Sequence, residues 1–182
     1  SSVLVGRPIQ VAAVITALLE DPRWSRLIDA DRIGVAGFSA GGYTSLLMVG
    51  AVPRFERFIG YCDRRPIDRA ICDAADRIKA KAASQSRTIT DFMQSRQDDL
   101  KRWGDTRDPR IRAAFVMAPL SLIFDTDGLT EIDRPVFLYY AQNDRVLLPS
   151  ENALHIKPLI RTLTRTIMVP GADHWVFMPP CS

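Results

Sequence analysis

The fold of this chain is decided by the stretch Ile33-Gly34-Val35-Ala36-Gly37-Phe38-Ser39-Ala40-Gly41-Gly42-Tyr43. Its first four residues form a short apolar run, which is typical of a buried strand. The glycine-rich turn that follows leads into an apolar segment, through Val49, that predicts a helix. The stretch therefore predicts a strand, a tight turn and a helix in direct succession.

The rest of the chain continues this alternation. Three further strands are expected, at 113–118, 136–141 and 166–169. Helices are expected at 8–20, with Pro8 in the first turn, and near 150–160. Strands that alternate with helices imply an α/β protein with a parallel sheet covered on both faces.

The segment 54–109 breaks the alternation, because its pattern predicts helices and no strand. One helix is marked by apolar residues between Ile67 and Ile78, and a second runs around 91–103. Two interpretations of this helical insertion stay open: a covering excursion that packs on the sheet, and a cap that shapes an acyl pocket.

Composition limits the class of protein. A chain of 182 residues, 47% hydrophobic and 25% charged, has the size of a single domain spanning 1–182. The longest nearly apolar stretch, 113–124, falls short of the roughly 20 residues that span a bilayer, so no membrane span is expected. The net charge of +3, from 24 basic and 21 acidic residues, does not predict a nucleic-acid partner.

The motif Gly37-x-Ser39-x-Gly41 is the candidate centre of chemistry. A nucleophile at the tip of a strand-to-helix turn adopts strained backbone angles, and small residues on either side let strand and helix approach. The backbone N–H of Ala40, at the start of the helix, then points to where an oxyanion forms. The ordinary alternative for Ser39 is a helix N-cap, but its place between a strand and a helix favours a nucleophile.

A serine nucleophile needs a base, and the chain has two histidines. His155 falls inside the helix expected near 150–160, where a surface role is the ordinary interpretation. His174 falls in a loop after the last expected strand, beside Gly171, and is therefore the candidate base.

The carboxylate that orients the imidazole is expected to be Asp144, directly after the strand 136–141. An ordinary turn residue is the alternative interpretation. Asp125, Asp127 and Asp173 are competitors, although a side chain adjacent in sequence to His174 cannot readily reach its Nδ1. The chain order of nucleophile, acid and base is that of the α/β hydrolases.

Several segments together resemble the predicted dienelactone hydrolases of the α/β-hydrolase superfamily, a bacterial group related to platelet-activating-factor acetylhydrolases. The resemblance covers most of the chain outside the insertion and is carried by Arg7-Pro8, the stretch Ile33 to Tyr43, Asp108-Pro109-Arg110-Ile111-Arg112-Ala113 and Gly171-Ala172-Asp173-His174-Trp175-Val176-Phe177. It implies the C-terminal part of an α/β-hydrolase fold.

Two departures refine what the resemblance implies. Dienelactone hydrolase proper has a cysteine nucleophile, so Ser39 favours ordinary ester hydrolysis. The acetylhydrolase branch places its acid after the next strand, where this chain reads Met117-Ala118-Pro119, and the acid role passes to Asp144.

The function expected is a serine esterase that cleaves small-molecule carboxylic esters through an acyl-enzyme, with the triad Ser39, Asp144 and His174. No cofactor or metal is expected, since the chain has no CxxC and only two histidines. Acyl transfer and peptide hydrolysis use the same triad. A non-catalytic α/β-hydrolase-fold scaffold is the alternative from another class.

The resemblance also implies parts that this chain does not contain. The strands that normally precede the nucleophile turn, and the second oxyanion-hole donor, are not in the sequence, so a missing N-terminal segment or a second chain is expected to complete the sheet. Cys62 and Cys72, two of three cysteines, form either a disulfide or a pair of thiols. Because group members are often exported, a disulfide favours a periplasmic or secreted location.

Overall fold

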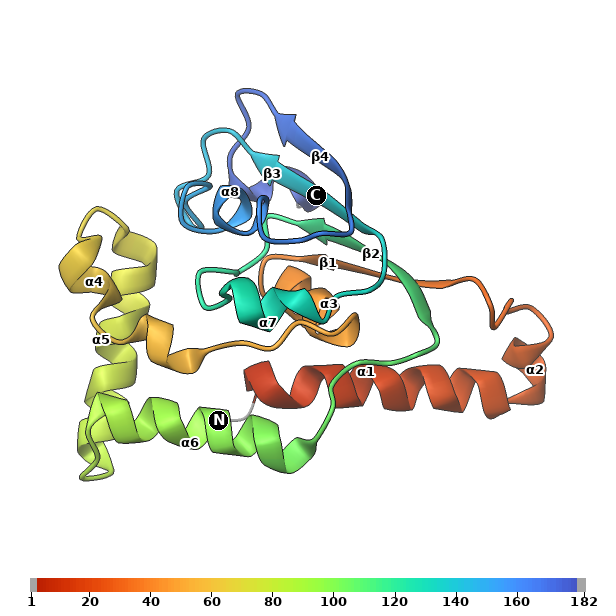
Figure 1. Cartoon of the computed structure of the whole chain (residues 1–182), viewed down its shortest axis with the longest axis horizontal. Coiled ribbons are helices and arrows are strands. Elements are labelled where there is room, and N and C mark those ends of the chain that lie inside the picture. The colour runs from red at the N-terminus through yellow and green to blue at the C-terminus, as the bar shows by residue number, and fades with distance from the viewer. Residues whose placement is uncertain (1–2, 180–182) are drawn as a thin grey trace.

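The computed structural model of the chain describes residues 3–179 (Figure 1). Within that range, one four-stranded sheet has the order β1-β2-β3-β4, and every neighbouring pair is parallel. Its strands are β1 (Ile33–Phe38), β2 (Ile111–Met117), β3 (Val136–Ala141) and β4 (Leu163–Val169). The α/β class and the parallel sheet are therefore confirmed.

The helices connect and cover these strands. Those outside the insertion are α1 (Val3–Glu20), α2 (Pro22–Ser25), α3 (Ala40–Met48), α7 (Thr126–Thr130), α8 (Ala153–Ile156) and the 3-10 helix η2 (His174–Phe177). Those of the insertion are the 3-10 helix η1 (Phe55–Phe58), α4 (Tyr61–Arg64), α5 (Arg69–Ser84) and α6 (Ile89–Trp103).

The core lies on one face of the sheet. Helix α3 packs on β1 and β2, and α1 packs on α3 (Figure 1). Val116 and Leu138 on this face are fully buried with Leu46 of α3 in one apolar cluster. The neighbouring positions Phe115 and Phe137, on the other face, are only partly buried. In the described part of the chain, the two faces of the sheet are therefore buried to different extents.

Two expected helices differ from those observed. Helix α1 begins at Val3 and holds Pro8 in its interior. Val5 is buried in the core, so apolar packing of the first turns offsets the hydrogen bond that proline removes. The helix expected near 150–160 shrinks to α8, and Pro158, two residues after its end, has no N–H with which to continue the helical hydrogen bonds.

The insertion forms a helical unit that is locally well specified. Asp68 caps α5 by accepting from the Ile71 N–H, and Thr88 forms a capping box with Asp91 at the start of α6. Helix α6 packs on α1 and η1, and α5 packs on α6. In Figure 1, α4 and α5 stand beside the edge of the sheet at which the strands end.

Cys62 and Cys72 form a disulfide that ties α4 to α5, with a Cα–Cα distance of 5.5 Å. Of the two sequence alternatives for this pair, the structure has the bonded one. Cys181, the third cysteine, lies outside the described residues.

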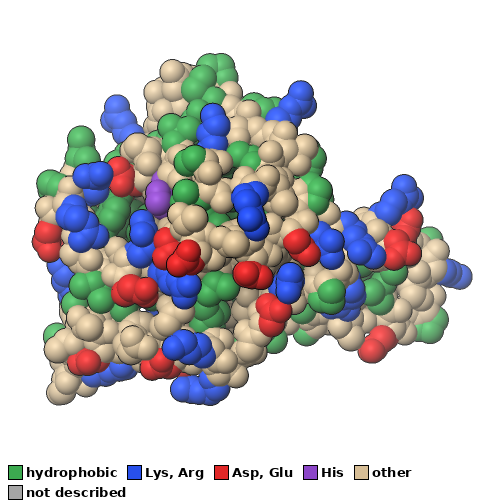
Figure 2. Space-filling model, viewed as in Figure 1, with side chains coloured by type: hydrophobic (Ala, Val, Ile, Leu, Met, Phe, Trp, Pro, Cys, Tyr) green, Lys and Arg blue, Asp and Glu red, His purple; other side chains and the backbone are tan. Residues whose placement is uncertain are grey.

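The described surface is mixed in charge. On the face shown in Figure 2, basic and acidic side chains are interspersed, and neither sign forms a continuous patch. None of the helices between residues 3 and 179 combines the length and apolar character that crossing a bilayer requires.

Candidate active site

Ser39 lies at the tip of the turn between β1 and α3 with φ 56° and ψ −118°. Such a positive φ costs a non-glycine residue about 1–3 kcal/mol, so it persists only where neighbouring groups impose it. The Ser39 N–H donates to the Met117 carbonyl at 2.9 Å, and the Ser39 carbonyl accepts from the N–H of Leu120 at 3.1 Å and of Tyr43 at 3.2 Å. Hydrogen bonds to both its N–H and its carbonyl therefore hold Ser39 in this strained conformation.

The ordinary role of a serine at this position is not observed. Ser39 occupies the N-cap position of α3, yet its hydroxyl makes no capping hydrogen bond. Ala40 is the first residue of the helix, so its N–H has no acceptor within the helix. A partly exposed hydroxyl and an unpaired helical N–H thus stand side by side at the positive end of the helix dipole.

Close packing at this turn depends on two glycines. A Cβ on Gly37 would overlap the Gly41 carbonyl group and lie 2.6 Å from Ser45 Oγ. A Cβ on Gly42 would lie 2.9 Å from the Pro119 Cβ. Gly41 has open space around the same position. The close approach predicted for Gly37 is present. The second position at which this turn has no room for a Cβ is Gly42, not Gly41.

His174 and Asp144 meet in a buried pair. His174 Nδ1 lies 2.7 Å from Asp144 Oδ2, and the two residues are 1% and 3% exposed. The other carboxylate oxygen, Oδ1, accepts from the Val146 N–H at 2.9 Å and the Leu147 N–H at 2.8 Å. Because a carboxylate only accepts, it places a proton on Nδ1 and leaves Nε2 as an acceptor in the neutral ring.

The two loops that carry this pair are joined to each other. Asn143 donates its N–H to the Ala172 carbonyl at 2.8 Å, and the Gln142 side chain accepts from the Gly171 N–H at 2.8 Å. These positioning residues were not predicted from the sequence, where Gln142 and Asn143 only marked the end of a strand.

Phe38 connects the pair to the Ser39 turn. Its ring packs on the His174 ring with centroids 4.6 Å apart. The structure brings the carboxylate of Asp144 and the imidazole of His174 into contact. Ser39 is the next residue after Phe38, whose ring packs on that imidazole, and within residues 3–179 no hydrogen bond joins the Ser39 hydroxyl to His174.

The competing residues have other partners. Asp125 caps α7 through the Gly128 N–H, and Asp173 caps η2 through the Trp175 N–H. Asp127 is exposed. His155 is half-buried, not the surface residue expected, and its Nε2 lies 2.8 Å from a backbone carbonyl oxygen, that of Phe124.

Two buried polar residues of the insertion, Tyr61 and Asp68, form a hydrogen-bonded pair near Asp144. Tyr61 donates its hydroxyl to Asp68 at 2.6 Å, and both residues are buried. Burial is the main cause that raises the pKa of Asp68, and the negative charges of Glu151 and Asp144 raise it further. Burial and the Asp68 hydrogen bond likewise raise the pKa of Tyr61. No sequence pattern signalled this neighbourhood.

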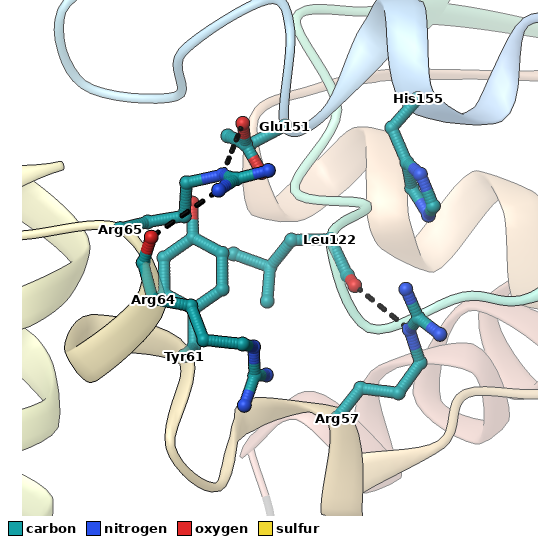
Figure 3. A pocket seen from close by; sticks show the side chains of 7 residues that line it. All are labelled: Arg57, Tyr61, Arg64, Arg65, Leu122, Glu151 and His155. Carbon is teal, nitrogen blue, oxygen red and sulfur yellow. Dashed lines mark hydrogen bonds and ion pairs between the residues drawn. The ribbon is translucent and has the colours of Figure 1, made fainter.

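A cavity of about 380 Å³ lies between α4, the loop after β2 and the segment around α8 (Figure 3). Arg57 lines the cavity and donates from Nε to the Leu122 carbonyl at 3.2 Å. Arg65 pairs with Glu151 at 2.9 Å and so ties the insertion to the segment after β3. His155 points into the same cavity.

No protein-family model matches the chain, and no curated protein matches it either. In the described residues, no group of three or more His, Cys, Asp or Glu side chains is arranged to hold a metal ion.

Proposed function

We propose that this chain is a serine hydrolase of the α/β-hydrolase fold and that it cleaves small carboxylic esters through an acyl-enzyme. The observation that carries the proposal is the buried hydrogen bond between Asp144 and His174, formed beside a strained, non-capping Ser39. Each of these features has an energetic cost, and backbone strain of this kind is concentrated at functional sites.

In the proposed reaction, the Ser39 hydroxyl oxygen attacks the ester carbonyl carbon while His174 Nε2 accepts the hydroxyl proton. The Ala40 N–H binds the oxyanion, and Asp144 stabilises the imidazolium. When the tetrahedral intermediate collapses, the imidazolium returns this proton to the leaving alcohol. A water molecule then attacks the acyl carbon while the same Nε2 accepts one of its protons. As this second intermediate collapses, the bond from the acyl carbon to Ser39 Oγ breaks, the imidazolium returns the proton to Oγ, and the carboxylic acid leaves.

Ester hydrolysis is favoured over a scaffold role by the free hydroxyl. A serine with a purely structural role at this position is expected to cap α3 with its hydroxyl. The Ser39 hydroxyl does not do so, and the strained backbone at Ser39 is of the kind found at functional sites. Because the Asp144 carboxylate accepts from Nδ1, the ring proton stays on Nδ1 and Nε2 is left as the acceptor that a general base requires.

The experiment is hydrolysis of 4-nitrophenyl acetate by the wild type and by Ser39→Ala. The proposal predicts a loss of at least about 10³-fold in kcat for Ser39→Ala. Ser95→Ala is the matched control, because Ser95 makes only a local bond to the Phe92 carbonyl within α6. If Ser39→Ala and Ser95→Ala hydrolyse the ester equally, the proposal fails and the scaffold alternative gains support.

A further inference from the structure

A second cavity, of about 360 Å³, lies inside the insertion, between η1, α5, α6, the first turn of α1 and the loop after β2. All of its lining residues are apolar except Lys81 and Arg96. Neither the fold nor the proposed reaction uses it. Filled with an apolar group, its walls would gain the dispersion contacts that an empty cavity forgoes.

The residues of α5 that line the cavity run along most of that helix. Ile71, Ala74, Ile78 and Lys81 line it from one face of α5, as their helical spacing requires. Ile71 and Lys81 are separated by ten residues of helix, a length of about 15 Å. A ligand that filled about 360 Å³ along that length of helix would have a mean cross-section of roughly 24 Å², which suits one unbranched chain.

Leu120, which lines the cavity, is hydrogen-bonded to the backbone of the proposed nucleophile, Ser39. The Leu120 side chain lines the cavity, and the Leu120 N–H donates to the Ser39 carbonyl. Ile71 lies in the first turn of α5, and Arg65, four residues before that helix, pairs with Glu151 in the segment after β3 that also carries Asp144. The Ile71 end of the cavity is therefore the end that faces the proposed site, and Lys81 lies at the far end.

Two cations line the cavity, Lys81 of α5 and Arg96 of α6. Arg96 pairs with Asp99 at 3.0 Å and lies over the Phe92 ring, but its Nε is buried without a hydrogen-bond partner. A methyl group gains little from contact with such groups, so the two cations set the length of chain that the cavity accepts.

The walls are held in place before any ligand binds. The disulfide at Cys72 fixes the start of α5, next to Ile71. The Gln97 side chain of α6 accepts from the Phe55 N–H at 3.2 Å and so joins α6 to η1. A pre-formed cavity saves the ordering cost that a flexible one would impose on binding.

On the basis of the proposed function, we infer that this cavity takes the acyl chain of the ester substrate, a single straight chain of about ten carbons. A cavity of about 150 Å³ holds the six carbons of benzene, so this one has room for roughly a dozen carbons. The substrate class is therefore the medium-chain ester, with its carbonyl at Ser39 and its chain running past Leu120 along α5.

The test is a series of 4-nitrophenyl esters from acetate through hexanoate and decanoate to hexadecanoate. We expect kcat/KM to rise by roughly two- to fourfold per methylene up to decanoate and to fall for hexadecanoate. Ala74→Phe, which fills the middle of the cavity, lowers the decanoate-to-acetate ratio of kcat/KM at least about tenfold. Ala80→Phe, on the exposed face of α5, is the matched control and keeps the wild-type ratio. Where Ala74→Phe does not fold, Ala74→Met is the smaller replacement.

A second measurement separates this inference from the proposed function. Ser39→Ala is titrated with sodium decanoate and with sodium acetate by calorimetry, and we expect saturable binding of decanoate alone, lost in Ser39→Ala/Ala74→Phe. Hydrolysis of acetate with no preference for decanoate, and no decanoate binding, would overturn the inference and leave the esterase intact. Decanoate binding without hydrolysis of any ester would overturn the proposed function and keep the cavity as a site for medium-chain carboxylates.

Discussion

Replacement of Asp144 by asparagine tests how the imidazole is oriented. The carboxylate has two separate roles: Oδ1 accepts the N–H groups of Val146 and Leu147, and Oδ2 accepts from His174 Nδ1. In Asp144→Asn the amide oxygen can keep both backbone bonds, so the turn is preserved. The amide NH₂ then faces Nδ1 and forces the imidazole proton onto Nε2, where it blocks the acceptance of a proton from Ser39.

The expected loss is about 10⁴-fold in kcat, which corresponds to roughly 5.5 kcal/mol of transition-state stabilisation. The loss of one charge-assisted bond lowers the free energy of unfolding by only about 1–3 kcal/mol. Hydrolysis of 4-nitrophenyl acetate and urea unfolding measure the two effects separately. Asp125→Asn is the control, because Asp125 caps the start of α7 and forms an ion pair with Arg54. An Asp144→Asn protein that folds and keeps more than a tenth of the wild-type kcat would refute the reasoning.

Three further results are expected. Gly37→Ala lowers the free energy of unfolding, measured in urea, by at least about 2 kcal/mol, because the new Cβ overlaps a backbone carbonyl group. Gly41→Ala has room for its Cβ and lowers the free energy of unfolding by less. Equal losses in the two variants would contradict the packing described. Replacing Cys62 and Cys72 together by serine lowers the free energy of unfolding by roughly 2–3 kcal/mol, the chain-entropy value for a loop of about ten residues, and a midpoint in urea unchanged by the double substitution would show that the bond is not formed. The pKa of Asp108 is lowered first by its hydrogen bonds from a neighbouring arginine, so its stabilisation is present above the unfolded pKa, about 3.9, and is lost as pH falls through the lower folded pKa. The stability difference between wild type and Asp108→Asn should therefore shrink as pH falls below about 4, and a difference that grows in acid would reverse the assignment.

The elements around Ser39 were predictable because local pattern and fold agree there. The apolar run that starts at Ile33 is followed directly by a glycine-rich turn and then by an apolar helix, and no residue in this stretch favours a different structure. Asp144 and His174 were predictable for a related reason: the carboxyl ends of parallel strands meet at one edge, so residues that follow β3 and β4 become neighbours.

Other features depend on contacts that no local pattern encodes. Pro8 marks a helix start by propensity, but burial of Val5 extends α1 backwards past it. The insertion could be predicted as helical, yet its position beside Asp144 depends on long-range bonds such as the Arg65–Glu151 pair. The requirement for Gly42 likewise arises from Pro119, a residue far away in sequence.

Covalent labelling shows whether Ser39 is a nucleophile and whether His174 activates it. The purified protein is incubated with a fluorophosphonate, and the intact mass and the labelled peptide are determined for the wild type and for His174→Ala. We expect one adduct on Ser39 that is lost, or formed far more slowly, in His174→Ala, while His155→Ala labels as the wild type does. A folded wild-type protein whose Ser39 stays unlabelled, or labels at the same rate without His174, would contradict the account.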